Sequence, residues 1–77
     1  MRNSDMQKRL RLLMANLGIT QKDLAIKTGF TESTISRYAN GTISPNEKSV
    51  CKIAEVTNVS PSWILGFGTD ENMERII

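Results

Sequence analysis

Hydrogen-bonding side chains share one face of a short helix predicted in the middle of the chain. At about 100° per residue, Glu32, Ser36, Asn40, Ser33 and Arg37 fall within about 140° of arc, with no apolar residue among them. Exposed helical faces favour long Lys and Glu side chains, whereas this one carries two serines and an asparagine. Short polar groups allow close approach to base edges, and serine bonds to any base. The face therefore favours contact with nucleic acid, and a plain solvated face is the alternative.

Two short helices must position this face. Thr20 and Asp23 predict the start of a helix at residues 21–28, which Gly29 ends. Thr31 predicts the cap of the next helix, at residues 32–39. Two short helices joined by a turn of three to four residues are typical of helix-turn-helix, in which the second helix is held out to enter a DNA groove.

A longer helix is expected at residues 5–17, where Ser4 and Gln7 have the spacing of a capping box. Its apolar stripe consists of Met6, Leu10, Leu13, Met14 and Leu17. Three cations, Lys8, Arg9 and Arg11, lie outside the stripe, and solubility is their simplest explanation.

The second half of the chain predicts two more helices. Ser44 as cap, Pro45 at the first helical position and Glu47 form the strongest helix start in the sequence. That helix ends at Asn58, and Ser60-Pro61 begins a brief fifth helix. No alternating β-branched run longer than four residues occurs, so we expect an all-α fold without a sheet.

Composition excludes several classes of function. The chain has 77 residues, which fits one small domain, and it contains no His and a single Cys. A disulfide framework and a Cys- or His-based metal site are therefore excluded, and Cys51 is interpreted as a core or boundary residue. Neither a nucleophile with its base nor a phosphate-cradling loop is found, so we expect no enzyme, no cofactor and no small-molecule ligand. A signal peptide is also missing, which favours the cytoplasm.

Charge is distributed unevenly along the chain. Residues 1–52 hold nine Lys and Arg against four Asp and Glu, whereas residues 53–77 hold one against four. The first two thirds thus carry +5 and the remainder −3, within a formal net charge of +2. This asymmetry indicates a surface that faces a polyanion, although a solvated face is again the alternative.

The stretch from Gln21 to Gly41 resembles the helix-turn-helix of the lambdoid phage repressor and Cro family, also called the XRE family. The resemblance is carried by Gln21 at the opening position, Ala25 at the helix crossing, Gly29 in the turn, Ile35 in the core and the final Asn40-Gly41. It continues through SPNEKSVCKIAEVTNVSPSWILGFG and so covers about residues 5–68.

This resemblance implies a compact five-helix domain that acts as a homodimer. Its recognition helices, residues 32–39, would enter successive major grooves of an operator with approximate two-fold symmetry. The base contacts would be Glu32, Ser33, Ser36 and Arg37. Gln21 would donate to a phosphate and brace the recognition helix.

Two of these base contacts have alternative interpretations. Glu32 either accepts a hydrogen bond from cytosine N4 or stabilises the positive end of its own helix. Arg37 either binds guanine through paired hydrogen bonds, which we favour, or holds a phosphate. The expected phosphate contacts are Gln21, Lys27, Thr31, Asn40, Thr42 and Lys48, with backbone N–H groups at the starts of the second and fourth helices.

We expect residues 1–68 to form the DNA-binding domain. Residues 69–77 would be a C-terminal tail that either takes part in dimerisation or is disordered. The expected dimer-interface residues are Trp63, Ile64, Phe67, Met73 and Ile76. We interpret Trp63 and Phe67 as core or dimer-interface residues, and stacking on bases is the alternative.

The sequence thus predicts a cytoplasmic, sequence-specific regulator of transcription that binds double-stranded operator DNA, in the bacterial nucleoid or in a phage-infected host. It would be either a Cro-like protein or the DNA-binding portion of a longer repressor. An antitoxin and a restriction-system controller are alternatives with the same fold. A helical protein-interaction module that has lost DNA binding is the alternative from another class.

Overall fold

The part of the chain that the structure describes folds into five helices, as the sequence predicts. The computed structural model describes residues 3–69 and residue 73, and this part of the chain contains no β-sheet. The helices are α1 (Asn3–Leu17), α2 (Gln21–Thr28), α3 (Glu32–Asn40), α4 (Glu47–Thr57) and α5 (Pro61–Ile64). None of these helices combines the length and the hydropathy that a membrane crossing requires.

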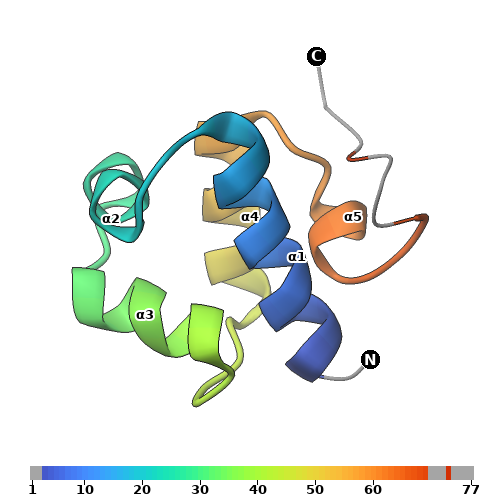
Figure 1. Ribbon diagram of the computed structural model, residues 1–77, viewed down its shortest axis with the longest axis horizontal. Helices are drawn as coiled ribbons and strands as arrows, with labels where there is room; N and C mark the ends of the chain where they lie inside the picture. The colour runs from blue at the N-terminus through green and yellow to red at the C-terminus, as the bar shows by residue number, and fades with distance from the viewer. Residues whose placement is uncertain (1–2, 70–72, 74–77) are drawn as a thin grey trace.

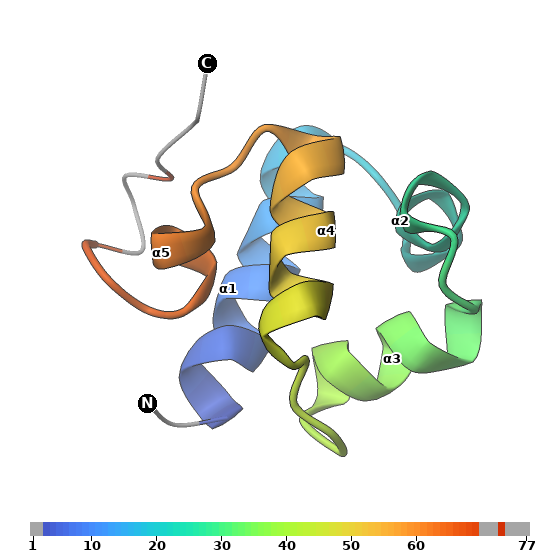
Figure 2. The ribbon, with the colours of Figure 1, turned by 180° about the vertical axis from the view of Figure 1, so that it is seen from behind.

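The helices are arranged so that α2 and α3 lie on one side of α1 and α4, and α5 lies on the other (Figures 1 and 2). In both views α2 is seen nearly end-on while α3 runs across the picture, so their axes are steeply inclined. Packing contacts join α3 to α2 and α1, and α5 to α4 and α1. The recognition helix predicted from the sequence therefore lies at the edge of the fold.

Local signals set the ends of α2 as predicted. The backbone N–H of Thr20 donates to Asp23 Oδ2 at 2.9 Å, and the N–H of Asp23 donates to Thr20 Oγ1 at 3.0 Å. This capping box holds the pKa of Asp23 below its ordinary value, chiefly through the Thr20 backbone N–H and then the Thr20 hydroxyl. Gly29 ends the helix with φ +83°, a left-handed conformation that suits glycine.

The expected start of α1 is wrong. The helix begins at Asn3, so Ser4 lies inside it rather than at the cap. Gln7, the other half of the expected capping box, instead lies against the turn after α3. A Cβ on Gly41 would come within 2.5 Å of Gln7 Oε1.

The expected cap of α4 is also wrong. The helix begins at Glu47, and its cap is Asn46, whose side chain accepts the N–H of Ser49 at 2.8 Å. Pro45 is buried in the connection from α3 instead of opening the helix, and Ser44 is exposed. The helix thus starts two residues after the locally favoured position, and Pro45 is buried ahead of it. The predicted end at Asn58 is confirmed, with φ +59°.

Arg9 is the main departure from the expected surface of α1. The residue is only 5% exposed, and its Nη1 atom donates to the carbonyls of Trp63 at 2.7 Å and Phe67 at 3.0 Å. Its Nη2 atom donates to Gly68 O at 2.9 Å, and the guanidinium lies 4.7 Å from the centre of the Trp63 ring. The explanation of Arg9 by solubility is therefore wrong, because its hydrogen bonds connect α1 to α5 and to the segment after α5.

Candidate nucleic-acid interface

The polar face of α3 is exposed, as the sequence predicts. Glu32, Ser33, Arg37 and Asn40 are exposed, and Ser36 is half-buried. On the opposite face, the three buried side chains are those of Ile35, Tyr38 and Ala39. The division expected from helical periodicity is confirmed, and it leaves one side of α3 free for a partner.

The turn before α3 is built around Thr28. The Thr28 hydroxyl donates to Leu24 O at 2.9 Å and accepts the N–H of Phe30 at 3.2 Å. Thr31 then caps α3 by accepting the N–H of Thr34 at 3.1 Å. These bonds fix the short connection, so the direction of α3 follows from that of α2.

Other contacts fix the second half of α3. The Tyr38 hydroxyl donates to Ser49 Oγ on α4 at 3.1 Å. The Phe30 ring meets the Tyr38 ring edge-on, with centres 6.4 Å apart. From α1, Arg11 Nε donates to Ala39 O at 2.7 Å. Because α3 is bound at both ends, its outer face has a defined position relative to α1 and α4.

The start of α2 offers hydrogen-bond donors but also carries a negative charge. Gln21 is half-buried at the first helical position and Lys27 is exposed. The backbone N–H groups of the first helical residues have no partner within an α-helix, so those of Gln21 and Lys22 can receive an anion. The Asp23 carboxylate lies at the same end of the helix, and Lys22 and Lys27 are near enough to lower its pKa.

The loop after α3 uses part of the predicted phosphate contacts internally. Asn40 Oδ1 accepts the backbone N–H of Thr42 at 2.9 Å and the Thr42 hydroxyl. The amide nitrogen of Asn40 is therefore the donor that can reach outward. Both the N–H and the hydroxyl of Thr42 already donate within the loop, which argues against Thr42 as a phosphate donor. At the start of α3, the Thr31 hydroxyl accepts the Thr34 N–H and shares a second hydrogen bond with the Thr34 hydroxyl, in which either oxygen can donate. When Thr34 donates in that bond, the Thr31 O–H is left for a phosphate.

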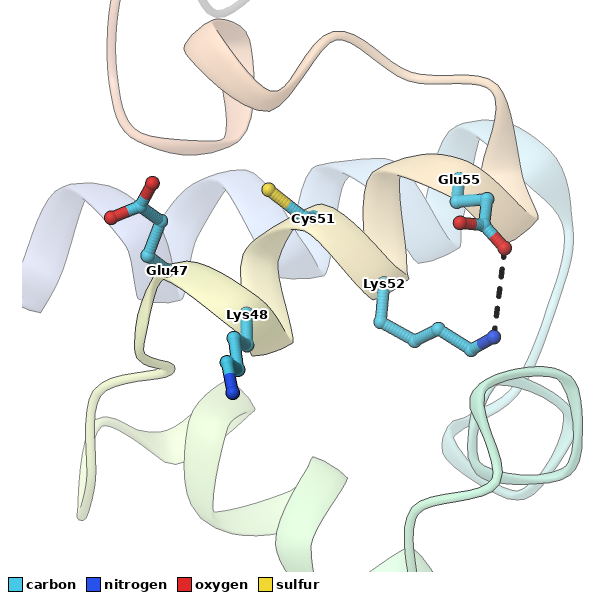
Figure 3. Close-up of a pocket in the computed structure, with 5 residues that line it drawn as sticks. All are labelled: Glu47, Lys48, Cys51, Lys52 and Glu55. Carbon is cyan, nitrogen blue, oxygen red and sulfur yellow. Dashed lines mark ion pairs between the residues drawn. The ribbon is translucent and has the colours of Figure 1, made fainter.

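The first turn of α4 separates its two charges. Lys48 is exposed and its side chain extends toward α3, whereas Glu47 points toward α5 (Figure 3). With Asn46 as the cap, the backbone N–H groups of Glu47 and Lys48 are the unpaired donors of this helix start. Further along α4, Lys52 Nζ lies 3.5 Å from Glu55 Oε1 (Figure 3).

Only part of the expected dimer interface is exposed. Trp63 and Ile64 are fully buried within the chain and offer no surface to a second copy, so both are core residues and their expected place in the dimer interface is wrong. Phe67 is 58% exposed, and Met73 is half-buried against the core. Ile76 lies outside the described residues. A groove of about 360 Å³ between α4 and α5 is lined by Glu47, Val50, Cys51, Pro61 and Leu65.

Arg11 is the residue near this interface to which the sequence assigned no binding role. Its contact with Ala39 joins positions 28 apart in the chain, so helical periodicity within α1 carries no signal for it. The sequence showed only that Arg11 lies outside the apolar stripe.

The steeply inclined α2 and α3, joined by a fixed turn with one face of α3 exposed, define a helix-turn-helix. A family model described as helix-turn-helix matches residues 8–64. The chain therefore belongs to the helix-turn-helix family, and the resemblance to its XRE type is confirmed.

Two curated relatives have regulatory names. An uncharacterized HTH-type transcriptional regulator of Haemophilus influenzae is 48% identical over 42 residues, which are 54% of this chain and 18% of that protein. The HTH-type transcriptional regulator DicA of Escherichia coli is 30% identical over 70 residues, which are 91% of this chain and 51% of DicA. The chain thus spans about half or less of the length of these relatives. No solved structure matches it significantly.

Proposed function

We propose that the protein is a transcriptional regulator that binds double-stranded DNA in a sequence-specific way. Its α3 helix would lie in the major groove of an operator, as in a phage repressor or a Cro protein. Membership of the helix-turn-helix family and the regulatory names of both relatives support this proposal.

One observation carries the proposal: the exposed face of α3 consists of short polar side chains with one Glu and one Arg, and the opposite face is buried in the core. Serine hydroxyls at positions 33 and 36 are small enough for backbone and base edges to approach closely. Arg37 supplies the paired donors that guanine O6 and N7 accept, and Glu32 can accept from cytosine N4. We propose Glu32, Ser33, Ser36 and Arg37 as the base contacts.

Phosphates would be held on both sides of α3. Gln21 and Lys27 belong to α2, Asn40 ends α3, and Lys48 extends from α4 toward α3. Thr42 shapes the C-terminal end of α3 through its internal hydrogen bonds, and we assign it that role instead of a phosphate contact. Thr31 caps α3 by accepting the Thr34 N–H, and its hydroxyl remains a proposed phosphate donor. Such contacts fix the position of the protein on the duplex and carry no direct sequence information.

We propose that a homodimer binds an approximately palindromic operator. We propose the exposed Phe67 and the groove between α4 and α5 as the dimerisation surface, because Trp63 and Ile64 are buried. This surface lies across the molecule from α2 and α3, since α5 and α2 flank opposite sides of α1 and α4 (Figure 1). Residues 1–68 would be the DNA-binding domain of the protein, acting in the cytoplasm.

Selection of bound duplexes from a random pool tests the proposed function. We expect enrichment of inverted repeats whose centres lie about one helical turn apart. The variant Arg37→Ala should bind the selected duplex about 5-fold or more weakly, because a paired contact to guanine is worth about 1 to 3 kcal/mol. Its affinity for scrambled DNA should fall much less.

Two results would contradict the proposal. Equal losses for Arg37→Ala on selected and scrambled duplexes would remove the base-reading role of Arg37. A pool from which nothing is enriched, together with poor retention on heparin, would favour a helical protein-interaction module instead. An antitoxin or a restriction-system controller would still enrich an operator, and these differ in their further partners.

A further inference from the structure

Arg11 presents unused hydrogen-bond donors beside the end of α3. Its Nε atom donates to Ala39 O at 2.7 Å, while the residue as a whole is exposed. No other described residue is bonded to its guanidinium, so the donors on both Nη atoms remain. A planar guanidinium with two free amino groups is suited to a phosphate.

We propose that Arg11 binds a phosphate of the DNA backbone, as a contact that α1 contributes from outside the helix-turn-helix. This inference rests on the proposed function, because it places DNA against α3. It goes further by adding a residue from a third element to the interface.

The first argument is that other hydrogen-bond donors lie near Arg11. The C-terminal end of α3 carries the outward amide nitrogen of Asn40, and Lys48 extends toward α3 from the first turn of α4 (Figure 3). Arg11 reaches the same end of α3 from α1. Donors from three helices thus converge on one end of the recognition helix, as expected of a backbone clamp.

The second argument is electrostatic. The C-terminal end of a helix carries about half a negative charge on its unpaired carbonyls, which repels a phosphate. Arg11 places a full positive charge on one of those carbonyls, that of Ala39. The guanidinium therefore offsets the repulsion at the place where the backbone would pass.

The third argument is preorganisation. An exposed Arg side chain ordinarily loses rotamer freedom when it binds a phosphate. In this chain the Nε bond already holds the side chain against α3, so less freedom is left to lose on binding. Lys52, which is also exposed, is instead paired with Glu55 on α4.

The test compares Arg11→Gln with the charge-matched control Lys52→Gln on the selected duplex and on scrambled DNA. Affinity is measured from 50 to 200 mM salt. Each phosphate contact contributes about 0.9 to the slope of log affinity against log salt, so Arg11→Gln should lower the slope by about one per chain on both duplexes. The control should leave the slope unchanged, and Arg11→Lys, which keeps the charge, should restore most of it.

Several outcomes would overturn the inference. An unchanged slope for Arg11→Gln would do so, whether or not affinity falls, because Arg11 would then only hold α3 in place. Partial unfolding of a variant does not affect the test, because a constant folded fraction leaves the slope of log affinity against log salt unchanged. If Arg11→Gln fails to fold, Arg11→Lys supplies a second comparison. Failure of the unaltered protein to bind any duplex would refute the proposed function itself, which is a distinguishable result.

Discussion

Two arginines on α1, Arg9 and Arg11, are only two positions apart and have different structural roles. Arg9 points inward and donates to the carbonyls of Trp63 in α5 and of Gly68 after it, and its guanidinium lies over the Trp63 ring. Arg11 lies outward and donates to the end of α3. Arg9 is only 5% exposed and so belongs to the core, where charge-assisted hydrogen bonds are roughly twice as strong as neutral ones.

Arg9→Met should destabilise the fold by about 2 to 4 kcal/mol, because it leaves several carbonyls without their donor. The matched change Arg37→Met, at an exposed position, should alter stability by less than about 0.5 kcal/mol. Urea unfolding of the two variants measures both values. Similar stability for both would mean that water replaces the Arg9 guanidinium at no cost.

The capping box of α2 predicts a specific pH dependence. Folding lowers the pKa of Asp23, so its stabilising effect is complete above the ordinary Asp pKa of about 3.9 and is lost as pH falls toward the lower folded value. The free energy of unfolding should therefore decline less steeply for Asp23→Asn than for the unaltered protein below about pH 5. Equal slopes for the two proteins would contradict this assignment.

At the scale of helices, the observed start of α4 differs from the start that the local sequence favours. Ser44-Pro45 has the stronger local signature, yet Asn46 is the cap and Pro45 is buried. Asn46→Ala should cost about 1 kcal/mol, a typical value for a lost cap, whereas Ser44→Ala should cost less than about 0.5 kcal/mol. Thermal unfolding of the two variants measures the difference, and the reverse order would restore Ser44 as the cap.

Elements whose signals are local could be predicted from the sequence. Thr20 with Asp23, Gly29, Thr31 and Asn58 act within a few residues of themselves, and each lies where the pattern indicated. The exposed face of α3 also follows from periodicity within one helix.

Features that depend on distant parts of the chain could not be predicted. Arg9 binds carbonyls more than fifty residues away, and Arg11 bonds to Ala39 on another helix. The burial of Trp63 and Ile64 likewise depends on how α5 packs against α1 and α4. A sequence pattern shows that such side chains are apolar or charged, but not which partner they meet.

At the scale of the whole molecule, the positive charge is concentrated in residues 1–52, even though the net charge of the chain is only +2. A dimer that neutralises about six to eight phosphates should lose roughly 10³-fold or more in affinity between 50 and 200 mM salt. Titration of the selected duplex at several salt concentrations measures this loss. An affinity that changes by less than about 10-fold over that range would show that few phosphates are contacted.

The central claim is that DNA lies against the exposed face of α3. Titrating the isotopically labelled protein with its selected duplex, while following backbone amide resonances, tests that claim most directly. The account predicts the largest shifts at residues 32–40 and at the starts of α2 and α4, with little change in α5. Shifts confined to the groove between α4 and α5, or no shifts with any duplex, would contradict it.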